Sequence, residues 1–166
     1  MRPQTLEINL PSRSLARYPE AATAASGGWL SAPGRGWYRQ LDKPPWQPPG
    51  WLFGPVWTVL CGLAATSAIA AWHTTPAPRR PRLFSLYGTN AVLNAAWIGI
   101  FFRARQPALA TADSAALLAT TVALIHCTRQ NSRLAAFTLT PYAAWVAFAT
   151  AFSGEITRCN TGNAGR

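Results

Sequence analysis

The charged residues of this 166-residue chain fall in clusters, and the clusters are separated by four long apolar runs that are almost free of charge. The first run, Leu52–Trp72, contains 21 residues and no Asp, Glu, Lys or Arg. A helix rises about 1.5 Å per residue, so a run of this length crosses a hydrocarbon core of about 30 Å. The other runs are Leu83–Phe102, Pro107–Cys127 and Leu134–Gly154. The sequence therefore predicts four membrane-spanning segments.

The overall composition agrees with a membrane environment. Apolar residues make up 49% of the chain and charged residues only 12%, which is roughly half the usual charged fraction. Four successive apolar runs leave little chain from which to build a solvated shell. Strands of a membrane barrel alternate in hydrophobicity over about 9 to 11 residues, and these runs do not alternate. We therefore expect an all-α, multi-pass integral membrane bundle, in either a bacterial cell envelope or an organelle membrane.

The net charge of +10 does not indicate a nucleic-acid partner. The basic residues flank the apolar runs, where they are ordinary determinants of membrane topology. No basic stripe is interleaved with aromatic residues that could stack on bases. If the four spans alternate in direction, most of the basic residues lie on the side of the N-terminal segment, which is predicted to be cytoplasmic. The lipid bilayer is thus the first expected partner.

Three parts are predicted along the chain. Residues 1–26 are polar, lack an apolar run long enough to span, and are expected to be disordered. Residues 27–160 form the transmembrane domain, and residues 161–166 form a C-terminal tail. Within the domain, residues 37–55 read WYRQLDKPPWQPPGWLFGP. Prolines prevent a continuous helix and tryptophans favour the headgroup level, so this stretch predicts a structured interfacial loop. Aromatic anchoring alone would explain its tryptophans, so a lid built from Trp46, Pro48 and Pro49 is an open alternative.

Two apolar runs carry a mixed polar and aromatic face. In the second run the face consists of Tyr87, Asn90, Asn94 and Trp97, and in the last run of Tyr142, Trp145, Ala149 and Phe152. Their spacing places the members of each set on one side of a helix. Two such faces could line a flat, mainly apolar cavity with a few hydrogen-bonding groups. Equally, the asparagines could hydrogen-bond between helices as packing contacts, with the aromatic residues filling the bundle. A row of small residues, Ala143, Ala147 and Ala151, predicts close helix packing.

The sequence contains no pattern typical of a catalytic site. It shows no Ser/His/Asp arrangement, paired carboxylates or phosphate-binding glycine loop. The three cysteines, Cys61, Cys127 and Cys159, are far apart and predict neither a metal site nor a disulfide framework. We therefore expect binding or transport rather than catalysis, with no metal and no required cofactor.

Four stretches of the sequence resemble the translocator protein family, whose members are also called tryptophan-rich sensory proteins or peripheral-type benzodiazepine receptors. The stretches are WYRQLDKPPWQPPGWLFGPVWTVL (37–60), TNAVLNAAW (89–97), ARQPALATAD (104–113) and PYAAWVAFATAFSGEITRCN (141–160). They occur in the family's order. The resemblance implies a five-helix membrane bundle, commonly a homodimer. It also implies binding of porphyrins such as protoporphyrin and haem, of sterols in the animal members, and of benzodiazepine-type ligands, with a role in tetrapyrrole transport, sensing or stress regulation.

Carried over residue by residue, the resemblance implies a ligand pocket made of Tyr38, Trp57, Asn94, Trp97, Trp145, Phe148 and Ala149. A porphyrin would stack on the three tryptophans, and Asn94 would supply a polar contact. Sterol binding is less well supported, because no basic residue follows Tyr142 within five positions, as the weak sterol-recognition pattern requires. Oxidative breakdown of a bound porphyrin is an alternative that the resemblance leaves open.

The chain also departs from the family. The residues before the WY motif do not provide the apolar first helix, so four spans are expected where the family has five. A bundle that lacks one wall could be a remnant that no longer binds a ligand.

Overall fold

The computed structural model describes residues 35–161, and within them the secondary structure is entirely helical. The predictions for the disordered segment 1–26, the missing first helix and the end of the tail lie outside the described residues. The helical elements are α2 (Arg35–Gln40), α3 (Gly50–Thr74), the 3-10 turn η3 (Ala77–Arg79), α4 (Arg80–Ile98), the π-helical η4 (Gly99–Arg103), α5 (Pro107–Arg129), α6 (Arg133–Thr138) and α7 (Thr140–Thr161).

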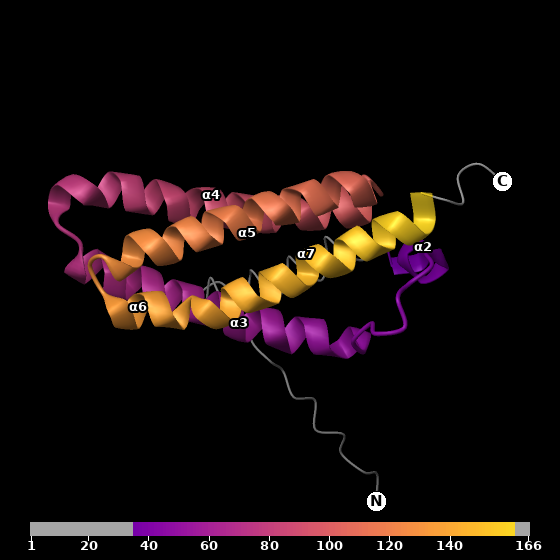
Figure 1. The fold of residues 1–166 in the computed structure, drawn as a ribbon, viewed down its shortest axis with the longest axis horizontal. Coiled ribbons are helices and arrows are strands. Elements are labelled where there is room, and N and C mark those ends of the chain that lie inside the picture. The colour runs from indigo at the N-terminus through magenta and orange to yellow at the C-terminus, as the bar shows by residue number, and fades with distance from the viewer. Residues whose placement is uncertain (1–34, 162–166) are drawn as a thin grey trace, which may run out of the picture.

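Three helical segments are long and apolar enough to cross a membrane: Gly50–Thr74, Pro107–Arg129 and Arg133–Thr161. The remaining predicted span corresponds to α4 and η4, which run alongside α5 (Figure 1). This segment is more polar, because arginines lie at its two ends and Asn90 and Asn94 interrupt it. The predicted all-α membrane bundle is confirmed.

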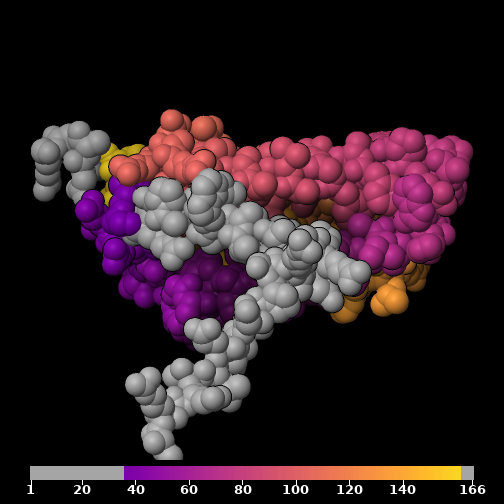
Figure 2. Space-filling model, turned by 180° about the vertical axis from the view of Figure 1, so that it is seen from behind, coloured from indigo at the N-terminus to yellow at the C-terminus, as the bar shows by residue number. Residues whose placement is uncertain are grey.

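Helix α5 is the centre of the bundle and packs between α4 and α7 (Figure 1). Its buried residues recur every three or four positions: Ala110, Ser114, Leu117, Thr121, Leu124 and Thr128. Such a stripe of small and apolar residues lets neighbouring helices approach closely. Helix α3 packs mainly on α6 and α7 and only a little on α4, and the view from behind shows α3 and α4 along opposite edges (Figure 2).

A polar layer joins α4, α5 and α7 near the middle of the bundle. The Asn90 amide donates to the hydroxyls of Thr120 (3.1 Å) and Thr121 (2.8 Å). The Tyr142 hydroxyl donates in turn to the Asn90 carbonyl oxygen (3.1 Å). Of the two roles that the sequence left open for this asparagine, the structure assigns that of a packing contact between helices. We refer to these four residues as the polar layer.

The predicted packing role of the small-residue row on α7 is wrong for contacts within the described chain. Ala147 and Ala151 are exposed, and Ala143 is only partly buried. Helix α7 instead buries a different face, which includes Val146 and Ile156. The row satisfies the spacing rule for close packing, but larger apolar residues on the neighbouring face bury more surface and determine which side turns inward.

Candidate functional site

The proline-rich loop between α2 and α3 is ordered by short hydrogen bonds of its own backbone. Gln47 N–H donates to the Pro44 carbonyl (3.1 Å). Leu52 N–H donates to the carbonyl of Pro49 (3.0 Å), and Pro49 is the N-cap residue of α3. Residues 41–49 form no regular element, as the prolines predicted. Pro48 is partly buried and Pro49 exposed.

A reciprocal pair of hydrogen bonds fastens this loop to the end of α7. Asp42 N–H donates to the Asn160 side-chain oxygen (3.1 Å), and the Asn160 amide donates to the Asp42 carbonyl (2.9 Å). The loop runs from this contact to the start of α3, so it connects the ends of α7 and α3 (Figure 1). We refer to the pair as the loop latch.

The loop places Trp46 on the aromatic side chains of α7. Its ring lies edge-on to Phe148 (5.8 Å between centroids) and to Phe152 (5.6 Å). Trp145 contacts the same Phe148 (5.2 Å) and also Phe53 of α3 (5.7 Å). The Trp46 ring, still about half exposed, thus covers this row of aromatic side chains from outside.

Trp57 approaches the same region from the middle of α3. Its ring lies edge-on to Tyr142 (6.0 Å). Both Trp57 and Trp145 pack against a buried group that contains Leu60 and Val146. Two of the predicted stacking tryptophans therefore share one wall of the bundle.

Tyr38 and Trp97 contact the same two phenylalanines, Phe101 and Phe102, at the end of α4. Trp97 stacks on Phe101 (4.9 Å, 11° between planes) and lies edge-on to Phe102 (6.0 Å). Tyr38 lies edge-on to both phenylalanines, at 5.8 and 6.0 Å. Burial raises the pKa of the Tyr38 hydroxyl above its ordinary value, because the charged form loses solvation.

Phe53 and Phe152 connect these two aromatic groups. Their rings contact each other (6.1 Å), and both belong to the packed group that surrounds Phe101. We define the aromatic cluster as the rings joined by these ring contacts and by this shared packing: Trp37, Tyr38, Trp46, Phe53, Trp57, Trp97, Phe101, Phe102, Tyr142, Trp145, Phe148 and Phe152. All the aromatic residues of the predicted pocket and lid are members.

The remaining predicted residues lie at the edge of the cluster. Ala149 is partly buried one turn after Trp145. The Asn94 side chain lies close to the Cys61 thiol of α3. The prediction missed Phe53 and Cys61, although each lies four residues from Trp57 and so on the same helical face. That spacing was the signal that could have found them.

Two polar atoms inside the aromatic cluster have no partner in the described part of the chain. They are the indole Nε1 atoms of Trp97 and Trp145, and both are fully buried. A buried N–H without an acceptor costs about 1 to 3 kcal/mol, so most such groups in folded proteins are paired. The arrangement leaves two preplaced donors between apolar ring faces.

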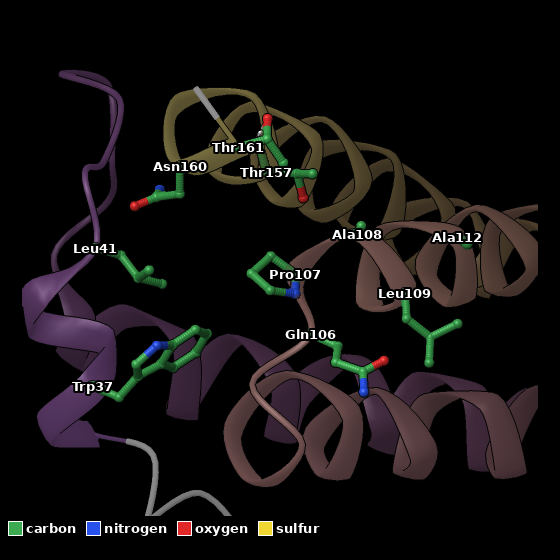
Figure 3. Close-up of a pocket in the computed structure, with 10 residues that line it drawn as sticks. All are labelled: Trp37, Leu41, Gln106, Pro107, Ala108, Leu109, Ala112, Thr157, Asn160 and Thr161. Carbon is green, nitrogen blue, oxygen red and sulfur yellow. Dashed lines mark hydrogen bonds between the residues drawn. The ribbon is translucent and has the colours of Figure 1, made fainter. Parts of the chain in front are cut away.

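The rings of the cluster are packed on one another. An open groove lies where the ends of α2, α5 and α7 meet (Figure 3). The groove has a volume of about 590 Å³. It is lined by Trp37, Leu41, Gln106, Pro107, Ala108, Leu109, Ala112, Thr157, Asn160 and Thr161. None of the predicted pocket residues lines it. Among residues 35–161, no group of His, Cys, Asp and Glu side chains could hold a metal ion.

The chain resembles known proteins along most of its length. The sequence model of the TspO/MBR family matches residues 18–158. The translocator protein of Homo sapiens is 35% identical over 159 residues, which covers 92% of this chain and 92% of that protein. The tryptophan-rich protein TspO of Bacillus cereus is 36% identical over 127 residues, covering 76% of this chain and 82% of that protein. With the three apolar helices, these matches show that the chain is an integral, multi-pass membrane protein that belongs to the TspO/MBR family.

Proposed function

We propose that the aromatic cluster binds a porphyrin such as protoporphyrin or haem, and that the protein acts in tetrapyrrole transport, sensing or stress regulation. The observation that carries the proposal is a pair of buried indole donors, Trp97 and Trp145, which have no partner among the described residues and lie within the packed aromatic cluster. A porphyrin offers flat faces for the rings and carboxylates that can accept from the indoles. A transport role is supported by the name translocator protein that several relatives carry.

Binding requires the packed rings to part. Helix α3, which carries Trp57, packs little on α4, which carries Asn94 and Trp97. In the proposal, these two walls separate to admit the ligand, and Asn94 exchanges its contact with Cys61 for one with the ligand. Sterols are the weaker candidate, because a neutral hydroxyl accepts a weaker hydrogen bond from an indole N–H than a porphyrin carboxylate does.

The test is a titration of detergent-purified protein with protoporphyrin, followed by quenching of tryptophan fluorescence. We expect saturable quenching, and a loss of affinity of at least about tenfold in the variant Trp145→Ala with Asn94→Ala, which removes one stacking surface and one hydrogen bond. Trp72→Ala is the matched control, because Trp72 lies at the other end of α3 against Arg80 and Phe84. Equal affinity in a folded double variant would rule out this site. Linear quenching without saturation in the unaltered protein would support a remnant that does not bind.

The proposal is one of binding rather than catalysis, and it requires no cofactor besides the ligand itself. The same samples test this point when they are kept in light and air. The porphyrin absorption should decay no faster with protein than with lipid alone, whereas faster decay would favour oxidative breakdown. A homodimer completes the proposal, supported by the exposed small side chains of Ala147 and Ala151, which would let a second helix approach closely.

A further inference from the structure

The end of the bundle away from the aromatic cluster carries a groove where α5, α6 and α7 meet. Its volume is about 540 Å³, and it is lined by Ile125, Arg129, Arg133, Ala136, Phe137 and Thr140. Two guanidinium groups thus share a groove whose other walls are mainly apolar. This combination suits an amphipathic ligand with a negative charge.

The electrostatic surroundings of the groove are uniformly positive within the described residues. Three further arginines, at positions 79, 80 and 82, lie at the same end of the bundle, whereas Asp42, Asp113 and Glu155 belong to the opposite half (Figure 1). Arg80 is engaged, because its Nε donates to the Thr75 carbonyl and its guanidinium lies over Trp72. Arg129 and Arg133 are exposed and form no ion pair among residues 35–161.

The turn between these two arginines is held in one conformation by hydrogen bonds. The N–H groups of Asn131 and Ser132 both donate to the Thr128 carbonyl, at 3.0 and 2.8 Å. The Ser132 hydroxyl accepts from Ala135 N–H and so caps α6. Because the turn is already ordered, the two guanidinium groups can bind an anion without the cost of first fixing the backbone.

Helix α6, which forms one wall of the groove, is anchored to three other helices. The buried Ser67 hydroxyl of α3 donates to the Ala135 carbonyl (2.7 Å) and lies 2.9 Å from the Tyr87 hydroxyl of α4. Tyr87 in turn lies 3.4 Å from the Thr128 hydroxyl of α5. The groove is therefore part of the packed bundle.

The apolar side chains around the groove identify the kind of anion. Leu134 is 76% exposed and Phe137 is 72% exposed, and both sit at the end of a membrane-spanning segment. Exposed large side chains at that level suit the interface between headgroups and acyl chains. We propose that this groove binds an anionic phospholipid, with its phosphate on Arg129 and Arg133 and an acyl chain along Phe137 and Ile125. Basic pockets between membrane helices hold lipid headgroups by the same physics.

The experiment counts lipids retained by the detergent-purified full chain in native mass spectrometry after exposure to phosphatidylglycerol or to phosphatidylcholine. We expect retention of phosphatidylglycerol in preference to phosphatidylcholine. The variant Arg129→Gln with Arg133→Gln should lose this retention by about tenfold to thirtyfold, and the corresponding pair of lysine substitutions should keep most of it. The matched control is Arg79→Gln with Arg82→Gln, which removes the same charge from the same end and should change retention less than about threefold.

Three results would overturn the inference. One is equal retention in the glutamine variant of the groove, with normal helicity by circular dichroism. Another is an equal loss in both glutamine variants, which would show diffuse attraction rather than a site. The third is displacement of the lipid by inorganic phosphate, because a groove that also holds an acyl chain does not exchange a lipid for a free anion. The test does not depend on the porphyrin proposal.

Discussion

The polar layer around Asn90 and the aromatic cluster around Trp145 are built from the same helices, but they pair their polar groups differently. In the polar layer, the Asn90 amide and carbonyl both have partners on neighbouring helices. In the aromatic cluster, the indole N–H groups of Trp97 and Trp145 are buried and have no partner among residues 35–161. A polar residue inside a span is therefore no sign of a binding site when its hydrogen bonds are all made within the bundle. Unpaired donors among ring faces are the more specific sign.

The largest expected effect is a difference in stability between variants of the polar layer and of the edge of the aromatic cluster. Asn90→Leu removes the hydrogen bonds of the polar layer and leaves the buried Tyr142 hydroxyl without its partner, so we expect a loss of about 2 kcal/mol in the free energy of unfolding. Asn94→Leu, one turn later on α4, removes the interaction with the nearby Cys61 thiol and should cost less than about 1 kcal/mol. Unfolding in mixed micelles of increasing denaturing detergent measures both. A larger loss of stability for Asn94→Leu than for Asn90→Leu would show that Asn94, and not Asn90, is the main packing contact between helices.

A smaller effect concerns ligand affinity. Trp145→Phe keeps an aromatic ring but removes an unpaired donor, so protoporphyrin affinity should fall about fivefold, as expected for one hydrogen bond. The free energy of unfolding of the ligand-free protein should stay the same or rise, because a buried unsatisfied group is removed. Trp72→Phe is the control. Unchanged affinity together with reduced stability would mean that the Trp145 indole serves packing alone.

The smallest effect is on the loop latch. Asn160→Ala removes both hydrogen bonds to Asp42, which are exposed, so the loss of stability should stay below about 1 kcal/mol. Limited trypsin digestion after Arg39 should become faster, and porphyrin affinity should fall a few-fold as Trp46 loses its position. Thr161→Ala is the matched control, because the Thr161 hydroxyl donates to the Thr157 and Arg158 carbonyls, which belong to its own helix. Digestion at an unchanged rate would show that the prolines alone hold the loop.

The sequence predicted the elements that depend on local pattern. Gaps in charge located the spans, and helical spacing placed Tyr142 and Trp145 on an inward face, as the structure has them. It left the role of Asn90 open, because the partners Thr120 and Thr121 come from another helix and no local pattern identifies them. The predicted close packing of Ala147 failed for the same reason, because the partners of α7 come from other helices.

Two features of the site depend on contacts between segments that are distant in the sequence, so they were not predicted. The closure of the aromatic cluster depends on Phe53 and Phe152, which lie about a hundred positions apart in the chain and meet only after folding. The groove between α5, α6 and α7 was missed because Arg129 and Arg133 fitted the pattern of topology determinants. The sequence does not show that an ordered turn brings these two arginines next to an apolar groove wall.

The π-helical turn Gly99–Arg103 has a consequence for the phase of the helix that contains it. The N–H of Ala104 reaches back five residues to the Gly99 carbonyl (2.9 Å), so this turn is wider than the usual 3.6 residues. With the extra residue, the adjacent Phe101 and Phe102 both reach the Trp97 ring, although neighbours on an ordinary helix point about 100° apart. A deletion of one residue here would restore the regular pitch and change the directions of the side chains within this last turn. The chain would keep its aromatic residues, but only one of Phe101 and Phe102 would still reach the Trp97 ring. Insertions and deletions in this turn should therefore alter ligand recognition more than many substitutions do.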